Sequence, residues 1–304
     1  MSLLVTGTVG IDTVETPQKR VDDVLGGSAF HFALAAGLVG PVRLVAAVGE
    51  DFPAECRATF DGTEVDLAGL EVRKGSKTFR WHGKYFDDMN QRESIRTDLN
   101  VIAEAPPPVP EAYRDSAYVF LGNTHPAVQR NFIEQLRGAK LIVMDTMDLW
   151  INTAREDLLK TLRLVHGVVM NDSEARLLTE QRDVLPAARD ILALGPKLVV
   201  IKKGEHGAVL VTADEVIALP AYPTDKVVDP TGAGDSFAGG MMGYLASVNR
   251  HDVSALKNAM AYGACIASIC IEDFSSFALK RSTKNDVNTR LRQYRDMLTI
   301  DEVK

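Results

Sequence analysis

Short apolar runs alternate with segments of helical periodicity along most of the chain. Because the runs are too short for helices, they predict buried strands, and the apolar positions of 128–136 predict a helix between two of them. Strand–helix–strand alternation at this pitch favours a parallel sheet with right-handed crossovers. We therefore predict one α/β domain over 1–304, with a doubly wound, mainly parallel sheet flanked by helices. The predicted strands include 3–5, 42–48, 117–121, 141–145, 165–170 and 198–201, and 208–211 returns as a hairpin.

The segment 71–100 breaks this rhythm. Its residues 78–81 alternate with period two, and a strongly polar stretch follows at 87–93. Such a pattern indicates a half-exposed antiparallel segment with one apolar face. A small sheet of this kind suits a lid that covers a substrate and excludes water. A plain surface hairpin is the alternative.

Composition narrows the class of protein. Apolar residues make up 46% of the 304 residues, enough for a full core, and the net charge of -7 disfavours nonspecific nucleic-acid binding. The three cysteines, at 56, 265 and 270, have no metal-site or disulfide spacing. The first residues resemble no signal peptide, and no run approaches the length of a membrane span. We expect a cytoplasmic protein without a membrane or nucleic-acid partner.

The sequence 229–235, Asp-Pro-Thr-Gly-Ala-Gly-Asp, carries the strongest chemical signal. It joins the end of an apolar run to a helix through a glycine-rich turn, which is an arrangement that binds anions through free N–H groups. Asp235 would repel a phosphate there unless it accepts a proton from a nucleophile. The alternative is an ordinary turn that caps a helix.

This sequence resembles the C-terminal signature of the ribokinase-like (PfkB) family of sugar and nucleoside kinases. The resemblance implies that Asp235 is the catalytic base, and that Gly232, Ala233 and Gly234 form an anion hole for the phosphoryl group. It also implies that Thr231 lies at the nucleotide and that Asp229 helps to hold a monovalent cation such as K⁺. In addition it favours the lid, which we expect from about 13–25 together with 71–100, and two packed lids would form a homodimer.

Acceptor-binding residues are expected where strands end. Asp12 follows the first strand, and Gly26 and Gly27 resemble the family's N-terminal Gly-Gly signature, where glycines permit a close backbone approach. His31 stands where many members carry Asn, and a partly buried helix histidine is the alternative. Asn123 follows another strand. Further acceptor candidates are the lid aromatics Phe79 and Trp81.

A further group of residues is expected to bind the nucleotide and the metal. Asn171 and Glu174 resemble the family motif that organises Mg²⁺ and the phosphates, but a helix capping box explains the same spacing. The turn 203–207 resembles the family's nucleotide-side turn, which places Lys203, Gly204 and Gly207 near ATP. Asn258 lies where relatives contact the adenine.

These residues predict a kinase that transfers the γ-phosphoryl of Mg·ATP to a hydroxyl of a sugar or sugar-containing molecule. A nucleoside kinase and a non-catalytic ligand-binding regulator are alternatives, and stacking of a base on Phe79, Trp81 and His31 would favour the nucleoside. A serine hydrolase at Ser236 is disfavoured because Ala238 breaks the Gly-x-Ser-x-Gly pattern.

Overall fold

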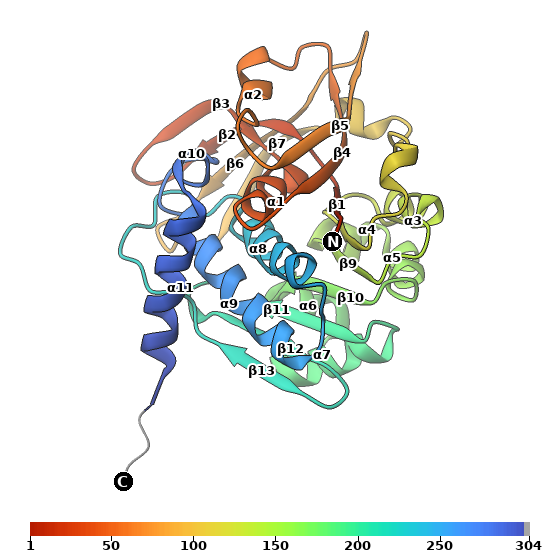
Figure 1. Cartoon of the computed structure of the whole chain (residues 1–304). Helices are drawn as coiled ribbons and strands as arrows, with labels where there is room; N and C mark the ends of the chain where they lie inside the picture. The colour runs from red at the N-terminus through yellow and green to blue at the C-terminus, as the bar shows by residue number, and fades with distance from the viewer. Residues whose placement is uncertain (301–304) are drawn as a thin grey trace.

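A nine-stranded sheet forms the centre of the computed structural model, which describes residues 1–300 (Figure 1). Its strand order is β13-β12-β11-β10-β9-β8-β1-β4-β5, and all pairings are parallel except those of β12 with β11 and β13. The predicted mainly parallel sheet is therefore confirmed. The strands are β1 Leu3–Thr6, β4 Val42–Gly49, β5 Val65–Arg73, β8 Tyr118–Leu121, β9 Leu141–Asp145, β10 Gly167–Asn171, β11 Leu198–Lys202, β12 Ala208–Val211 and β13 Val216–Leu219.

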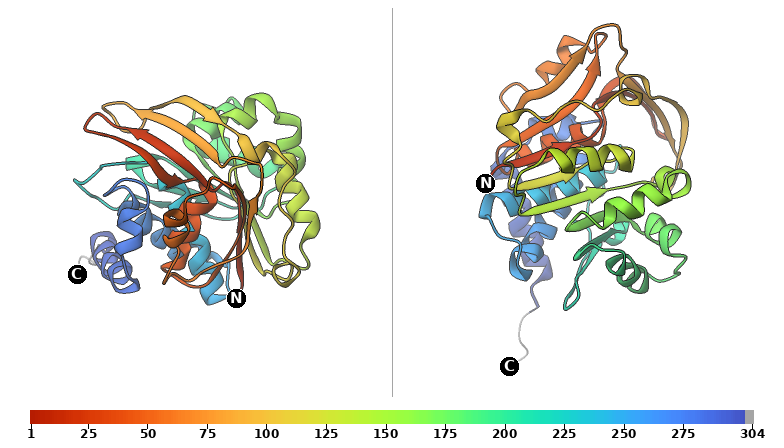
Figure 2. Two further views of the ribbon diagram at one scale, coloured as in Figure 1. Left: turned by 90° about the horizontal axis from the view of Figure 1, so that it is seen from above. Right: turned by 90° about the vertical axis from the view of Figure 1, so that its right-hand side faces the viewer.

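Helices cover both faces of this sheet (Figures 1 and 2), as doubly wound folds require. Helices α1 and α8–α11 share one buried cluster, and α3–α7 share the other. The clusters are separate because alternate strand residues point to opposite faces. The helices are α1 Ser28–Gly37, α2 Ala54–Ala58, α3 Pro126–Gln135, α4 Asp148–Thr153, α5 Arg155–Leu162, α6 Asp172–Thr179, α7 Val184–Ala193, α8 Ala233–Val248, α9 Val253–Cys270, α10 Phe277–Arg281 and α11 Lys284–Leu298.

Glycines let α8 approach two neighbouring helices closely. A Cβ on Gly239 would lie 2.5 Å from the Phe32 carbonyl of α1, and one on Gly240 would lie 2.9 Å from the Tyr262 carbonyl of α9. The helix α8 is therefore held on both sides. In length and hydropathy α9 would suffice to span a membrane, but 61% of its residues are buried in the protein, so its apolar character belongs to the core.

The segments predicted to form a lid build a separate four-stranded sheet that lies across one edge of the body (Figure 2). We call this sheet the lid, and its closing over a substrate remains a prediction. The sheet begins at residue 10, whereas the lid is predicted from about 13, and residues 71–73 belong to the main sheet. A register shift between Asp12 and Val14 interrupts the alternation of β2, which obscured this strand in the sequence. Its strand order is β3-β2-β6-β7, with bounds β2 Gly10–Glu15, β3 Arg20–Gly26, β6 Phe79–Tyr85 and β7 Arg92–Asp98.

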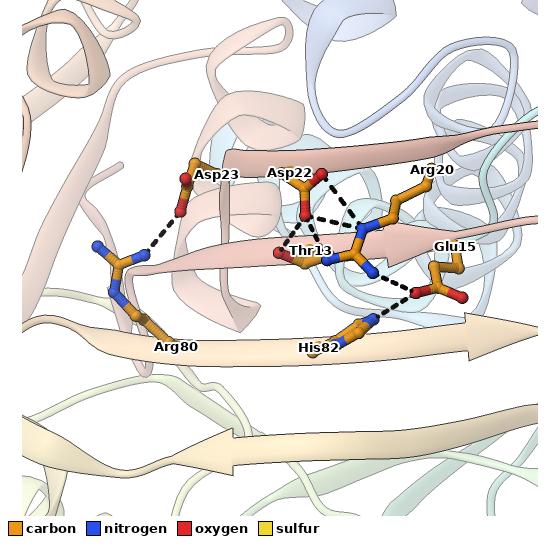
Figure 3. A network of polar contacts seen from close by, with 7 residues as sticks. All are labelled: Thr13, Glu15, Arg20, Asp22, Asp23, Arg80 and His82. Carbon is orange, nitrogen blue, oxygen red and sulfur yellow. Dashed lines mark hydrogen bonds and ion pairs between the residues drawn. The ribbon is translucent and has the colours of Figure 1, made fainter.

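The two faces of the lid differ in chemistry. The inner face contributes Val14, Val24 and Tyr85 to a small core with Phe274 of the body. The outer face carries a charged network in which Arg20 joins Asp22 to Glu15, Glu15 contacts His82, and Arg80 pairs with Asp23 (Figure 3). Exposed ion pairs of this kind contribute little stability each. A homodimer that packs through the lid remains a prediction, and it would have to bury this polar face.

Candidate active site

The first turn of α8 lies at the carboxyl edge of the main sheet. Gly232 precedes the helix with φ 75°, a left-handed conformation that favours glycine, and the helix begins at Ala233. The N–H groups of Gly234 and Asp235 therefore lie in a first turn, where donors lack intrahelical acceptors. A Cβ on Gly232 would overlap the His31 ring, and one on Gly234 would lie 2.6 Å from the Lys202 ammonium. Only glycines fit this loop.

Asp235 stands in a cluster of buried charges. Burial and the neighbouring Asp145 carboxylate raise the pKa of Asp235 to about 7, although the Lys202 ammonium opposes this shift. Lys202 forms an ion pair with Asp145 at 3.9 Å, and both side chains are buried or nearly so. Burial opposes the charge of Lys202, but Asp145, Glu174 and Asp235 outweigh it and raise the lysine's pKa. The single ammonium of Lys202 thus partly neutralises three carboxylates.

Asp12 reaches the same cluster from the lid. It is 5% exposed, packs so tightly against Gly26 that a Cβ there would overlap its carboxylate, and its Oδ1 atom has no hydrogen bond within the part of the chain that the structure describes. Burial, followed by the charges of Asp229 and Asp235, raises the pKa of Asp12 to about 8. A buried acceptor without a donor is costly, so this atom is suited to a ligand's hydroxyl.

His31 is the second buried polar group without a partner. It is 1% exposed, and neither ring nitrogen forms a hydrogen bond within the described residues. Burial lowers the pKa of His31 to about 4, so the ring is neutral and offers one donor and one acceptor. Because it packs on Gly232, the ring stands beside the predicted anion hole. Gly27 directly precedes α1, the helix that carries His31, and has φ 102°. A Cβ on Gly27 would lie 2.4 Å from the Thr8 carbonyl oxygen.

Asn171 and Glu174 form the capping box that the sequence offered as an alternative. The Asn171 side chain accepts the Glu174 N–H at 2.8 Å, and the Glu174 carboxylate accepts the Asn171 N–H at 2.8 Å. The box uses one carboxylate oxygen of Glu174. Burial and the nearby Asp145 raise the pKa of Glu174 to about 7, which marks a negative charge that a cation would stabilise. Glu174 can therefore cap α6 with one carboxylate oxygen and still offer the other to a cation.

The nucleotide-side turn differs from expectation in one residue. Lys202, at the end of β11, directs its ammonium toward Gly234, whereas the adjacent Lys203 only contributes its backbone N–H to the Gly207 carbonyl. Gly204 has φ 55°, and a Cβ on it would lie 2.8 Å from the side-chain oxygen of Asn90 in the lid. A Cβ on Gly207 would overlap the Leu219 carbonyl. These glycines shape the turn and admit the lid's tip.

Three other predicted residues already have partners within the protein. The amide of Asn123 accepts from the Trp150 indole at 2.9 Å and donates to the Met147 sulfur at 3.0 Å. Asn258 donates to its own helix and accepts from Arg295. The indole N–H of Trp81 donates to Ser94, and its ring packs on Gly83 and is in cation–π contact with Arg92. Asn123 is therefore poorly placed to bind an acceptor without rearrangement.

The beginning of the signature motif has a clear structural role. The buried carboxylate of Asp229 accepts the backbone N–H groups of Thr231 at 2.8 Å and Ser275 at 3.0 Å, which ties the motif to the loop before α10. The Thr231 hydroxyl donates to the Tyr85 hydroxyl of the lid at 3.2 Å. Within residues 1–300, no group of three or more His, Cys, Asp or Glu side chains is placed to hold a metal alone.

Strand periodicity carried a signal for the two residues that the sequence analysis missed. In β11, Val200 faces the cluster of α1 and α8–α11, so Lys202 points to that same face and Lys203 lies beyond the strand. The same count places Asp145 of β9 on the face of Val143. Both therefore point toward α8, where Asp235 begins.

The comparisons place this arrangement in a known class. The model of the pfkB family of carbohydrate kinases matches residues 4–276. The chain belongs to this family, and it is an ATP-dependent phosphotransferase whose acceptor is a hydroxyl of a sugar or nucleoside. The family assignment rules out the serine hydrolase alternative. Ser236, the nucleophile of that alternative, is also 0% exposed.

Nucleoside kinases are prominent among the relatives. The chain is 33% identical over 261 residues to a cytidine kinase from Thermococcus kodakarensis, which covers 82% of this chain and 89% of that protein. It is 27% identical over 263 residues to a nucleoside kinase from Methanothermobacter thermautotrophicus, covering 85% and 82%. Aminoimidazole riboside kinase from Salmonella enterica, solved with aminoimidazole riboside and an ATP analogue, has the same fold with a TM-score of 0.77, 20% identity and coverage of 96% and 100%.

The crowding of buried carboxylates predicts that the stability of the folded protein depends on pH. Asp12 titrates near 3.8 when unfolded but at about 8 when folded, so it destabilises the protein increasingly as pH rises between these values. We expect Asp12→Asn to raise the melting temperature above that of the unmodified protein, and the difference to grow from about pH 4 to about pH 8.

The control is Asp22→Asn on the same hairpin, where Arg20 lowers the carboxyl's pKa. Removing that charge should give no such stabilisation. Thermal unfolding followed by fluorescence measures both variants, and a melting temperature of Asp12→Asn that falls with pH relative to the unmodified protein would contradict the assignment.

Proposed function

We propose that this kinase phosphorylates a hydroxyl on the ribose of a nucleoside, with Asp235 as the base. The observation that carries the proposal is the meeting of Asp12 and Asp235 in one buried cluster beside the first turn of α8. Asp12 has an unpartnered oxygen for acceptor hydroxyls, and Asp235 stands where a proton must leave. A cytidine kinase and a nucleoside kinase, which align over 82% and 85% of this chain, support the nucleoside over a free sugar.

The acceptor pocket would bind both parts of a nucleoside. Asp12 accepts hydrogen bonds from the ribose, while Gly26 and Gly27 leave space for the sugar to approach the backbone. Trp81 lies opposite Asp12 in the lid, and its indole face can stack on a base. The neutral ring of His31 supplies one further donor or acceptor next to Gly232. A free pentose would use only the first of these contacts.

The transfer step needs only charge and position. The acceptor hydroxyl gives its proton to Asp235, its oxygen forms a bond to the γ-phosphorus of ATP, and the bond to the bridging oxygen breaks, so that ADP leaves with the electron pair. Negative charge on the moving phosphoryl is stabilised by the first-turn N–H groups of α8 and by Lys202. Asp235 then releases the proton to solvent.

Glu174 and Asn171 would hold Mg²⁺ through water, with phosphate oxygens as the other ligands. Hard oxygen donors suit this ion, and burial together with the Asp145 carboxylate raises the pKa of Glu174, so a cation there would stabilise its charge. When bound, the ion neutralises the phosphates and orients them. Asp229 retains lone pairs for a monovalent cation, because each oxygen accepts one N–H. We place the enzyme in the cytoplasm, where ATP and Mg²⁺ are available.

An acceptor panel tests the substrate class. ADP formation should be measured with cytidine, adenosine and inosine, and with ribose, fructose and fructose 6-phosphate. We expect at least one nucleoside to exceed ribose in kcat/KM by about 100-fold, because the base adds binding contacts that ribose lacks. A free or phosphorylated sugar as the best acceptor would overturn the nucleoside assignment. If none of these acceptors supports ADP formation, the non-catalytic regulator is favoured.

Removal of the proposed base should stop the chemistry. Asp235→Asn should lower kcat by about 10²- to 10⁴-fold, as expected for loss of general base catalysis, whereas the buried Ser236→Ala should leave it nearly unchanged. Because the base acts when deprotonated, kcat should rise with pH around a midpoint near the Asp235 pKa of about 7. The reverse ranking of the two variants would refute this mechanism.

The two adjacent lysines provide a second test. Lys202→Met should lower kcat/KM by about 100-fold, because the phosphates lose a buried cation, while Lys203→Met should have little effect. Since Lys202→Met also leaves Asp145 unpaired, the double variant Lys202→Met/Asp145→Asn serves as a stability control. It should recover the melting temperature but not the activity. Equal losses in Lys202→Met and Lys203→Met would be inconsistent with this assignment.

A further inference from the structure

The inner face of the lid carries an arginine that no step above uses. In β7, Arg92 pairs with Tyr85 of β6, and Ser94 pairs with Gly83. Directly opposed residues point to the same face of a sheet, so Arg92 shares the inner face with Tyr85 and Trp81. Its guanidinium carbon lies 5.7 Å from the centre of the Trp81 ring, in cation–π contact. The side chain is thus directed toward the body.

Two contacts locate this part of the lid over the transfer site. Tyr85, opposite Arg92, meets the Thr231 hydroxyl of the signature motif at 3.2 Å. Asn90, two residues before Arg92, lies against Gly204 of the nucleotide-side turn. Arg92 therefore stands between the loop that begins α8 and the turn expected at the ATP phosphates. The acceptor subsite at Asp12 lies farther along the lid, opposite Trp81.

The charge balance of the site calls for a second cation. Asp145, Glu174 and Asp235 share Lys202, and the phosphates of ATP would add more negative charge. The positive charge of Arg92 acts on this site, since it opposes the rise that burial causes in the pKa values of Asp145 and Asp235. Within residues 1–300, no carboxylate forms an ion pair with Arg92, and the residue is exposed. Its guanidinium has a hydrogen bond with the Tyr85 hydroxyl, and its remaining donors are available to a ligand.

We infer that Arg92 is a catalytic residue that the lid delivers to the phosphoryl group during transfer. The inference rests on the proposed function, because it assumes that the phosphoryl passes between Gly204 and the first turn of α8. The planar guanidinium offers two parallel donors, which match two phosphoryl oxygens. Arg92 forms and breaks no covalent bond, and it stabilises charge only while the lid is closed. Closure of the lid and completion of the site would then be one event.

The same strand supplies a matched control. Arg96 also belongs to β7 but pairs with His82 on the outer face and forms an ion pair with Asp98. We expect Arg92→Ala to lower kcat about 100-fold with the best nucleoside, as does loss of one donor to a transition-state charge, while the KM for the nucleoside changes little. Arg96→Ala should retain full kcat. The kcat of Arg92→Lys should fall between these two values, since lysine keeps the positive charge but lacks the two parallel guanidinium donors.

Chemical rescue distinguishes a catalytic role of Arg92 from a structural role within the lid. Guanidinium ion, at concentrations below those that unfold the protein, should restore part of the kcat of Arg92→Ala and should not stimulate Arg92→Lys or Arg96→Ala. A purely structural role would predict no rescue. Melting temperatures of Arg92→Ala and Arg96→Ala should agree, which shows that both variants fold.

Three outcomes would overturn the inference. They are a kcat of Arg92→Ala equal to that of Arg96→Ala, a loss of kcat without guanidinium rescue, and a loss confined to the KM of the acceptor. The last outcome would assign Arg92 to acceptor binding. None of them affects the proposed function, which fails only if the unmodified enzyme phosphorylates no nucleoside or if Asp235→Asn remains active.

Discussion

The burial of several carboxylates close to one another is the constraint on which the rest of this structure depends. Parallel strands of one sheet end at a common edge, and this edge gathers Asp145 and Glu174 around Lys202. The lid adds Asp12, and α8 adds Asp235. Like charges in a poorly solvated site raise one another's pKa values, so the free protein holds a cost that cations and hydroxyls of the substrates can relieve. Ligand recognition and this electrostatic strain therefore have the same origin.

The lid gives this strained site a cover that is tied to it chemically. Tyr85 bonds to the motif that begins α8, and Asn90 touches the nucleotide-side turn, so the lid contacts both halves of the site. Its inner face packs on the body through Val14 and Val24, while its outer face stays charged. The difference between the two faces follows from strand alternation and determines which side of the sheet packs on the body.

Sequence reasoning succeeded where a local pattern determines structure. Strand–helix alternation predicted the sheet, and the motif 229–235 predicted a glycine turn before a helix, with φ 75° at Gly232. Tertiary contacts add what a local pattern does not contain. Strand register, which the sequence analysis did not count, directs Lys202 rather than Lys203 toward Gly234, and the amide of Asn123 already contacts Trp150 and Met147. Arg92 gave no sequence signal, because its role depends on where a strand folds back.

The central claim is that Asp12, whose pKa is raised in the free protein, accepts hydrogen bonds from hydroxyl groups of the acceptor. Calorimetry of nucleoside binding without ATP, at about pH 7.5 in buffers of different ionisation enthalpy, counts the protons exchanged on binding. Donated hydrogen bonds stabilise the carboxylate and lower its pKa. The account therefore predicts net proton release by the unmodified protein and none by Asp12→Asn. Binding with proton uptake, or release that persists in Asp12→Asn, would contradict it.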